Sequence, residues 1–220
     1  MSSADRVGAF AEKKSLIAAE QKRADVLERR RNFGIATRFV DPASFVFLDE
    51  TGAKTNMTRL YGRALVGERC VDHTPHGHWK TVTLLSAMRL DGVMRPATAV
   101  YDGPMNCDTF VAYTEHCLVP TLRPGDVVVM DNLSSHKDTR VRELIENVDA
   151  DLWYLPAYSP DLNPIEKLWS KVKAWLRRVM ANTHDGLVEA IADALRAVDA
   201  NECAGYFRAC GYGQELCELL

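Results

Sequence analysis

Two continuous apolar runs, each followed by an aspartate, constrain the fold of this chain more than any other feature. The first run is Phe45-Val46-Phe47-Leu48 before Asp49, and the second is Val127-Val128-Val129-Met130 before Asp131. Apolar runs without polar alternation are typical of strands that are buried on both faces of a sheet. In open α/β sheets, ligands bind outside the carboxyl ends of such strands. If these two strands are neighbours, their aspartates lie together at a ligand-binding edge.

The other segments supply a hairpin, a third strand and several helices. We expect strands at 79–88, 93–101 and 152–155, and helices at 106–118, 137–147, 165–179, 184–198 and in the tail. Asn163 and Pro164 predict the start of the helix at 165–179, because asparagine is a good helix cap and proline is favoured in the first turn. This helix carries an apolar face that ends at Val179. Strands first, then alternating strands and helices, predict an α/β fold with a mixed sheet flanked by helices.

The N-terminal region differs from the rest in its polarity. Residues 9–33 are rich in helix-forming residues but carry few aliphatic ones, which indicates an appended helix instead of a core element. We therefore expect a helical appendage or linker at 1–40 and one domain at 41–220. A chain of 220 residues is long enough for one such core.

Composition excludes several classes of protein. No apolar run approaches the ~20 residues that span a bilayer, and the N-terminus lacks the apolar stretch of a secretory signal. Six cysteines without a CxxC pair indicate reduced thiols in a cytoplasmic protein. The net charge of −3 excludes a globally basic protein, but residues 167–178 hold five Lys or Arg and no acid. That helix face is the best candidate for binding phosphates, and a merely solvated face is the alternative.

The carboxylates allow more than one interpretation. A strand-end aspartate can simply cap the following turn. Two of them close together resist joint ionisation unless a cation lies between them, and paired carboxylates with Mg²⁺ are common in phosphoryl transfer. Glu166 stands three residues after Asn163, so it either completes a capping box or faces the edge of the sheet. Spacing alone leaves these alternatives open.

The residues between Asp131 and Glu166 are more specific than the spacing. Asp131 opens an Asp-Asn-x-x-x-His-Lys block, and Glu166 closes a Tyr-Ser-Pro-Asp-Leu-Asn-Pro-Ile-Glu block, with 34 residues between the two acids. A Leu-Asp-Glu-Thr-Gly block around Asp49 precedes them. In this order the blocks resemble the DDE transposases, and within them the bacterial insertion-sequence branch related to mariner elements. The resemblance covers about residues 40–215.

This resemblance implies a ribonuclease H-like fold and a set of site residues. Asp49, Asp131 and Glu166 would be the catalytic triad and would bind two Mg²⁺ or Mn²⁺ ions. The implied activity is cleavage at transposon ends, followed by transfer of the freed 3′-hydroxyl to target DNA. The implied partners are both DNAs and a second copy of the chain in a synaptic complex. The implied location is the bacterial cytoplasm, at the nucleoid, with no membrane association.

Residues near the triad are candidates for supporting roles. Asn132 either orients Asp131 or forms a turn. His136, which matches the family's histidine, either approaches the scissile phosphate, supports a metal ligand or has a structural role at the start of a helix. Lys167, Lys171 and Arg178 are candidate contacts to the phosphate backbone beside the site.

Three histidines, His73, His76 and His78, lie within six residues. Such a cluster suggests zinc, but Cys70 and Asp72 do not stand at a familiar zinc-ligand spacing. We therefore favour a loop with neutral or DNA-contacting histidines.

The length of the chain before the first strand affects its expected partners. Members of the family carry an N-terminal helix-turn-helix region, whereas only about 40 residues precede the strand of Asp49. We expect a catalytic half, a split second reading frame or a truncated copy. Its cleavage should need a DNA-reading partner, either a separate chain from an upstream reading frame or the missing N-terminal region. The alternatives are an inactive or repurposed DNA-binding remnant of a transposase, and another ribonuclease H-like nuclease, which the 34-residue gap disfavours.

Overall fold

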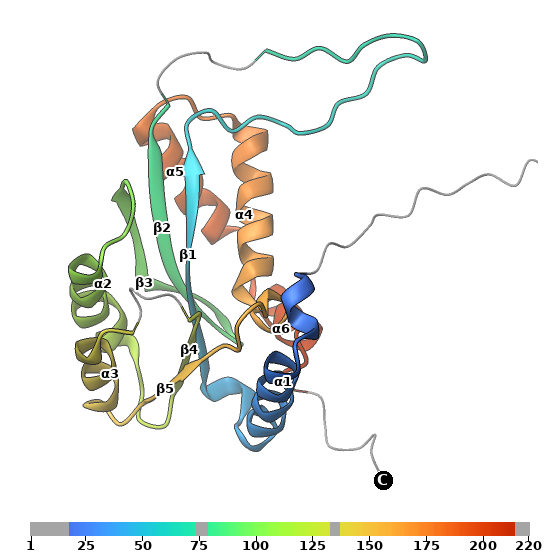
Figure 1. Cartoon of the computed structure of the whole chain (residues 1–220). Helices are drawn as coiled ribbons and strands as arrows, with labels where there is room; N and C mark the ends of the chain where they lie inside the picture. The colour runs from blue at the N-terminus through green and yellow to red at the C-terminus, as the bar shows by residue number, and fades with distance from the viewer. Residues whose placement is uncertain (1–17, 74–78, 133–136, 214–220) are drawn as a thin grey trace, which may run out of the picture.

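A five-stranded mixed sheet forms the centre of the protein (Figure 1). The computed structural model describes residues 18–73, 79–132 and 137–213. The strands are β1 (Phe45–Lys54), β2 (Thr81–Arg89), β3 (Gly92–Asp102), β4 (Val127–Met130) and β5 (Asp151–Tyr154). Their order is β3-β2-β1-β4-β5, with β3, β2 and β1 antiparallel and β1, β4 and β5 parallel. The predicted fold class is confirmed.

Helices cover both faces of this sheet. They are α1 (Ala24–Ala36), α2 (Cys107–Tyr113), α3 (Thr139–Glu146), α4 (Ile165–Val179), α5 (His184–Arg196) and α6 (Ala200–Ala209), with a π-helical turn at Thr114–Leu118 and 3₁₀ turns at Ala19–Lys22, Thr37–Phe39, Pro42–Ser44, Val119–Thr121 and Pro160–Leu162. The helices α2 and α3 lie on one side, and α4, α5 and α6 lie on the other (Figure 1). Among the described residues, no helix combines the length and the apolar character that crossing a membrane requires.

The apolar run of β1 divides its side chains between two cores. Phe45 and Phe47 pack with α4, α5 and α6, whereas Val46 and Leu48 pack with α2 and α3. Because side chains alternate along a strand, Asp49 faces the same side as Phe47, toward α4. The strand therefore directs a carboxylate into the layer between the sheet and α4.

The first strand does not end at Asp49, as the sequence suggested, but continues to Lys54. Its partner β2 pairs with it from Phe47 to Lys54, whereas β4 pairs with it only over Phe45–Phe47. The long hairpin with β2 keeps β1 extended after β4 has ended. Asp49 thus marks the point where β1 separates from β4.

The N-terminal helix α1 contacts the loop that precedes α4. Val26 of α1 is buried, and both guanidinium Nη atoms of Arg30 donate to Asp161, at 3.0 and 2.6 Å. The side-chain amide of Gln21 donates to the same carboxylate at 3.3 Å. The region expected to be an appendage therefore contacts the segment that carries the third predicted carboxylate.

Candidate active site

Asp49 lies in a buried, polar environment between β1 and α4. Its side chain is 7% exposed. Its Oδ1 accepts a hydrogen bond from the backbone N–H of Glu50 at 2.8 Å. Its Oδ2 accepts two more at 3.2 Å, from Nδ2 of Asn163 and from Nε1 of Trp169. Three neutral donors therefore hold this carboxylate in one orientation.

The other two predicted carboxylates act electrostatically on Asp49. Burial, together with the charges of Glu166 and Asp131, raises the pKa of the Asp49 carboxyl from 3.8 to about 7. The N–H groups of Glu50 and Trp169 oppose this rise in pKa. A charge effect of this kind requires proximity, so the structure brings Asp49, Asp131 and Glu166 into one region.

Register explains why Asp131 is near Asp49. Phe47 of β1 aligns with Val129 of β4, and Asp49 and Asp131 each stand two residues further along, which explains why the charge of Asp131 acts on Asp49. Asp131 directly follows the last residue of β4 and is partly exposed. Glu166 is exposed and lies in the first turn of α4. Asp131 and Glu166 therefore act on Asp49 through their charges near the end of the parallel strands, and their convergence on one shared ion stays a prediction.

Asn163 does not cap α4, which corrects the sequence-based expectation. The cap position is Pro164, which makes no side-chain cap hydrogen bond. The Asn163 side chain is instead buried and donates to Asp49, and Glu166 completes no capping box. A residue before a proline prefers an extended backbone, and Asn163 has φ −106° and ψ 101°. The extended backbone lets the side chain of Asn163 turn toward β1.

Trp169 was the second residue whose role the sequence did not indicate. It lies three residues after Glu166, so the two share one face of α4. That spacing was visible in the sequence, but apolar neighbours made packing the simpler interpretation. The apolar face of α4 is buried at Ile165, Leu168, Trp169, Val172 and Leu176. It does not extend to Val179, which is 46% exposed.

The loop before α4 is held by α1 and contains a strained residue. Tyr158 has φ +58°, which is uncommon for a residue with a large side chain. Asp161, three residues after Tyr158, forms an ion pair with Arg30 of α1. The hydrogen bonds from Arg30 hold the pKa of the Asp161 carboxyl below its usual value. A loop that adopts a costly backbone conformation needs such restraints from its surroundings.

Asn132 is exposed and faces a cleft next to Asp131. The cleft has a volume of about 480 Å³ and is lined by α1 and the end of β5, including Arg29, Asn32, Phe33, Trp153 and Tyr154. His136 lies outside the described residues, so its predicted role is open.

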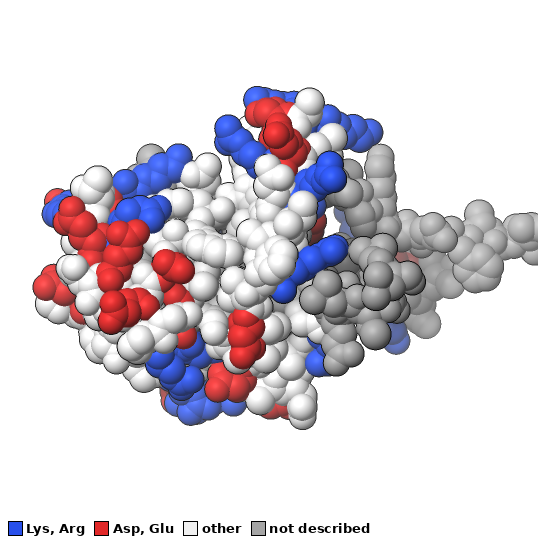
Figure 2. Space-filling model, turned by 90° about the horizontal axis from the view of Figure 1, so that it is seen from below, with Lys and Arg blue, Asp and Glu red and all other residues white. Residues whose placement is uncertain are grey.

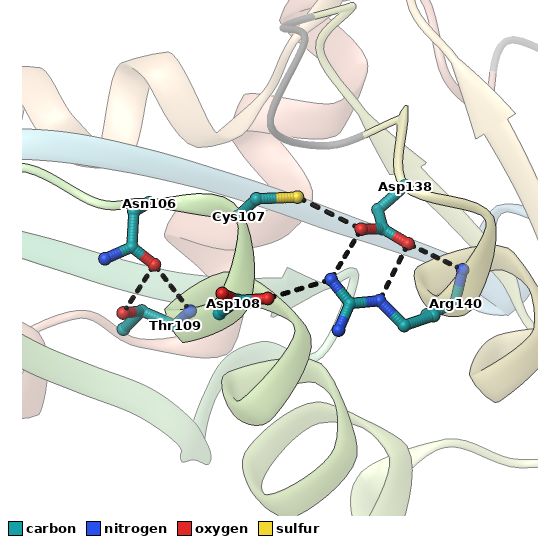
Figure 3. A network of polar contacts seen from close by, with 6 residues as sticks. All are labelled: Asn106, Cys107, Asp108, Thr109, Asp138 and Arg140. Atoms are coloured by element: carbon teal, nitrogen blue, oxygen red, sulfur yellow. Dashed lines mark hydrogen bonds and ion pairs between the residues drawn. The ribbon is translucent and has the colours of Figure 1, made fainter.

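A polar network follows the loop after β4 (Figure 3). Asp138 accepts from the backbone N–H of Arg140 at 2.9 Å and from the thiol of Cys107 at 3.1 Å. The Arg140 guanidinium contacts both Asp138, at 2.7 Å, and Asp108, at 2.9 Å. The hydrogen bonds from Arg140 hold the pKa of Asp138 well below its usual value. The network joins the first turn of α2 to the first turn of α3.

The basic residues of α4 are only partly available to a ligand. Lys171 donates to Glu202 at 2.5 Å and to the carbonyl of Ala197 at 2.8 Å, so it joins α4 to α5 and α6. Arg178 is exposed, with its guanidinium 4.4 Å from the ring centre of Trp175, and Lys167 is half-buried. On the face seen from below, Lys and Arg lie among Asp and Glu (Figure 2). Arg178 is the more accessible of the predicted phosphate contacts.

The histidine cluster is only partly described. His73 is exposed, and His76 and His78 lie outside the described residues. Within the described ranges, no three His, Cys, Asp or Glu side chains come close enough to form a ready metal site. The three predicted carboxylates form no such group in these ranges, although Glu166 and Asp131 act on Asp49 through their charges.

A mixed sheet in this strand order, with carboxylates at the end of its parallel part, defines a ribonuclease H-like fold. Residues 44–187 match the family model described as "DDE superfamily endonuclease". The chain belongs to this family. The resemblance stated from the motifs is thereby confirmed, and the assignment to the insertion-sequence branch stays a prediction.

Similar proteins cover different shares of the chain. The Tcb2 transposase of Caenorhabditis briggsae is 33% identical over 38% of this chain and 34% of its own length. The Tc1 transposase of Caenorhabditis elegans is 30% identical over the same shares. The chain spans about a third of the length of these curated relatives.

Solved structures share the fold at low identity. The Mos1 transposase paired-end complex with left transposon end has a TM-score of 0.75 and 17% identity, over 93% of this chain and 64% of that one. The Mos1 catalytic domain with raltegravir and Mg has a TM-score of 0.61 and 17% identity, over 86% of this chain and 90% of that one.

Proposed function

We propose that this chain is the catalytic domain of a DNA transposase, which cuts transposon ends and joins the freed 3′-hydroxyl to target DNA. The observation that carries this proposal is the environment of Asp49. A buried carboxyl whose pKa is raised to about 7 by burial, Glu166 and Asp131 is costly for a fold to keep. Perturbed carboxylates at the carboxyl edge of a sheet are typical of functional sites.

The donor chemistry of these residues fits a divalent cation. All three side chains offer carboxylate oxygens, which suit Mg²⁺ or Mn²⁺ better than zinc. The charge repulsion on Asp49 is the kind of unfavourable interaction that a cation offsets. Mos1 transposase has been solved with Mn and with Mg. We propose two such ions here, held by Asp49, Asp131 and Glu166.

The three ligands come from three regular elements, which suits precise positioning. Asp49 belongs to β1, Asp131 follows β4 and Glu166 lies in the first turn of α4. When bound, divalent ions activate the attacking oxygen and stabilise the leaving oxygen. The chain itself would supply orientation and exclude water from the buried side of Asp49. We propose that Asn132 and His136 support the site. We also propose that the phosphate backbone of DNA is contacted by Lys167, Lys171 and Arg178.

The proposed partners follow from this activity. They are transposon-end DNA and target DNA, a second copy of the chain in the synaptic complex, and a separate chain or region that reads the end sequence. The structural neighbours include a complex of Mos1 with a transposon end. Within the chain we propose a helical region at 1–40 and a catalytic domain at 41–220. We place the protein with the DNA of a bacterial cell.

A nicking assay tests the proposal. The full chain would be incubated with labelled duplexes that carry the inverted repeats flanking its gene, in Mg²⁺ or Mn²⁺. We expect cleavage that Asp131→Asn abolishes while the fold is kept. Binding without any cleavage would favour the remnant of a transposase, and cleavage of RNA–DNA hybrids alone would favour another ribonuclease H-like nuclease.

A further inference from the structure

Two side chains from the α4 region converge on one oxygen of Asp49. Asn163 and Trp169 both donate to Oδ2, at 3.2 Å each, while Oδ1 receives one backbone N–H, from Glu50, at 2.8 Å. Asn163 is 3% exposed and Trp169 is 2% exposed, so water does not compete with these bonds. The two oxygens of Asp49 are therefore held in unequal environments.

Packing of the fold does not account for Asn163. Its side chain caps no helix, and its Oδ1 is buried without a hydrogen-bond partner among the described residues. A buried amide whose N–H group donates a hydrogen bond but whose oxygen accepts none costs free energy, whereas a buried apolar residue of the same size does not. The interaction that offsets this cost is the bond from Nδ2 to Asp49.

The same helix contains an internal comparison for Trp169. Trp175, six residues later, has a buried Nε1 with no hydrogen-bond partner in the described part of the chain. The helix thus tolerates a buried indole N–H that donates to nothing. The bond from Trp169 to Asp49 is consequently a specific feature of this position and not a general requirement for burying a tryptophan in α4.

We propose that Asn163 and Trp169 are positioning residues that hold Oδ2 of Asp49 and so present Oδ1 to a divalent cation. An ionised carboxylate offers about four acceptor positions. The described residues use three of them, two on Oδ2 and one on Oδ1, which leaves one on Oδ1. Groups that orient a metal ligand typically change metal affinity or activity by about 10- to 100-fold when removed. This inference rests on the proposed function, because it needs a cation at Asp49.

The matched pair Trp169→Phe and Trp175→Phe tests the proposal. Both changes remove one indole N–H from the same helix and keep an aromatic ring. Mn²⁺ binding to each full-length variant would be measured from the electron paramagnetic resonance signal of free Mn²⁺, beside a thermal melt. We expect Trp169→Phe to weaken Mn²⁺ binding about tenfold, and Trp175→Phe to change it less than twofold. Nicking should lose kcat in Trp169→Phe, with the KM for DNA unchanged.

A second variant tests the contribution of the Asn163 side-chain amide. Asn163→Leu keeps the approximate size of the side chain and removes its donor, and we expect a loss of Mn²⁺ affinity at least as large. If Asn163→Leu misfolds, the Trp169→Phe result still decides.

A spectroscopic readout separates positioning from packing. The indole N–H resonance that disappears in Trp169→Phe should shift when Mg²⁺ is added, and the one that disappears in Trp175→Phe should not. Unchanged Mn²⁺ affinity in Trp169→Phe, together with an indole signal that Mg²⁺ does not move, would overturn the inference and leave the proposed function intact. If the unmodified chain binds no Mn²⁺ and cuts no DNA, the proposed function fails. An indole shift caused by Asp49→Asn would then assign the hydrogen bond to packing alone.

Discussion

Two buried aspartates near opposite ends of the parallel strands are held in opposite ways. Asp126 precedes β4 and is 3% exposed, and Arg89 donates to both its oxygens, at 2.7 and 2.5 Å. The backbone N–H of Arg123 adds a third bond at 2.6 Å. Asp49, near the carboxyl end of β4, is similarly buried, but its donors among the described residues are neutral and its charged neighbours are Glu166 and Asp131.

The ion-paired carboxylate of Asp126 stabilises the fold, whereas the ionised carboxylate of Asp49 destabilises it. At Asp126 the negative charge is matched by a buried guanidinium, so both partners depend on each other. At Asp49 the negative charge is opposed by burial and by like charges, so the folded chain is more stable when the carboxyl is neutral. Four predictions test this contrast, in order of decreasing effect.

Breaking the pair at Asp126 should have the largest effect. Arg89→Met leaves an unpaired charge in a buried position, and we expect the free energy of unfolding to fall by about 3–5 kcal/mol. Urea denaturation measures this value. Arg95→Met, on the exposed side of β3, is the control and should change it by less than ~0.5 kcal/mol. Similar values for the two variants would show that Asp126 does not depend on Arg89.

Neutralising Asp49 should have the opposite sign. The pKa of Asp49 is raised to about 7 in the folded chain, above the unfolded value of 3.8. The protonated Asp49 carboxyl therefore contributes its full stabilisation below pH ~4. This stabilisation declines as the pH rises toward 7 and is lost above pH 7, where the carboxyl is ionised. In metal-free buffer at pH 8, Asp49→Asn should be more stable than the unmodified chain, on the order of 2–4 kcal/mol.

The advantage of Asp49→Asn should disappear as the pH falls to 4. Denaturation of both proteins across this range provides the measurement. Asp126→Asn is the matched control, and it should destabilise the fold at pH 8. A loss of stability in Asp49→Asn at pH 8 would contradict the assigned environment.

Releasing α1 from the loop before α4 should have a modest effect. The pair between Arg30 and Asp161 is partly exposed, with side chains 21% and 53% accessible. Arg30→Met should therefore cost about 0.2–1 kcal/mol. Amide hydrogen exchange at Asp161 and Leu162 should accelerate, since the loop loses a restraint. The neighbouring change Arg29→Met should leave that exchange rate as it is.

Neutralising Glu166 should have the smallest effect on stability. A capping box, one of the two alternatives that the sequence left open for Glu166, would predict a loss of stability, but the cap residue Pro164 makes no side-chain cap hydrogen bond. We expect the melting temperature of Glu166→Gln without metal to hold or rise slightly, because a like charge near Asp49 is removed. Glu202→Ala is the comparison, since Glu202 forms a capping box with Asp199, and we expect its loss to cost about 0.5–2 kcal/mol.

The sequence determined the strands, the type of fold and the set of carboxylates. The runs at 45–48 and 127–130 are local patterns, and apolar residues in such a row bury themselves wherever a sheet forms. Because the aspartates directly follow those runs, their meeting at one edge required only that the strands be neighbours. The family motifs could likewise be read in order, since they are contiguous in the chain.

Tertiary structure alone decided which atoms surround Asp49. Asn163 and Trp169 reach it across 114 and 120 positions of the chain, and Lys171 finds Glu202 across 31. The local sequence favoured a helix cap for Asn163 and a core residue for Trp169, and it did not indicate that Lys171 would contact Glu202. Hydrogen bonds between side chains that are far apart in the sequence depend on how α4 packs against the sheet. The local sequence pattern contains no information about that packing. For the same reason, only the structure showed that β1 extends to Lys54, because this extension depends on the pairing of β2 with residues Phe47 to Lys54 of β1.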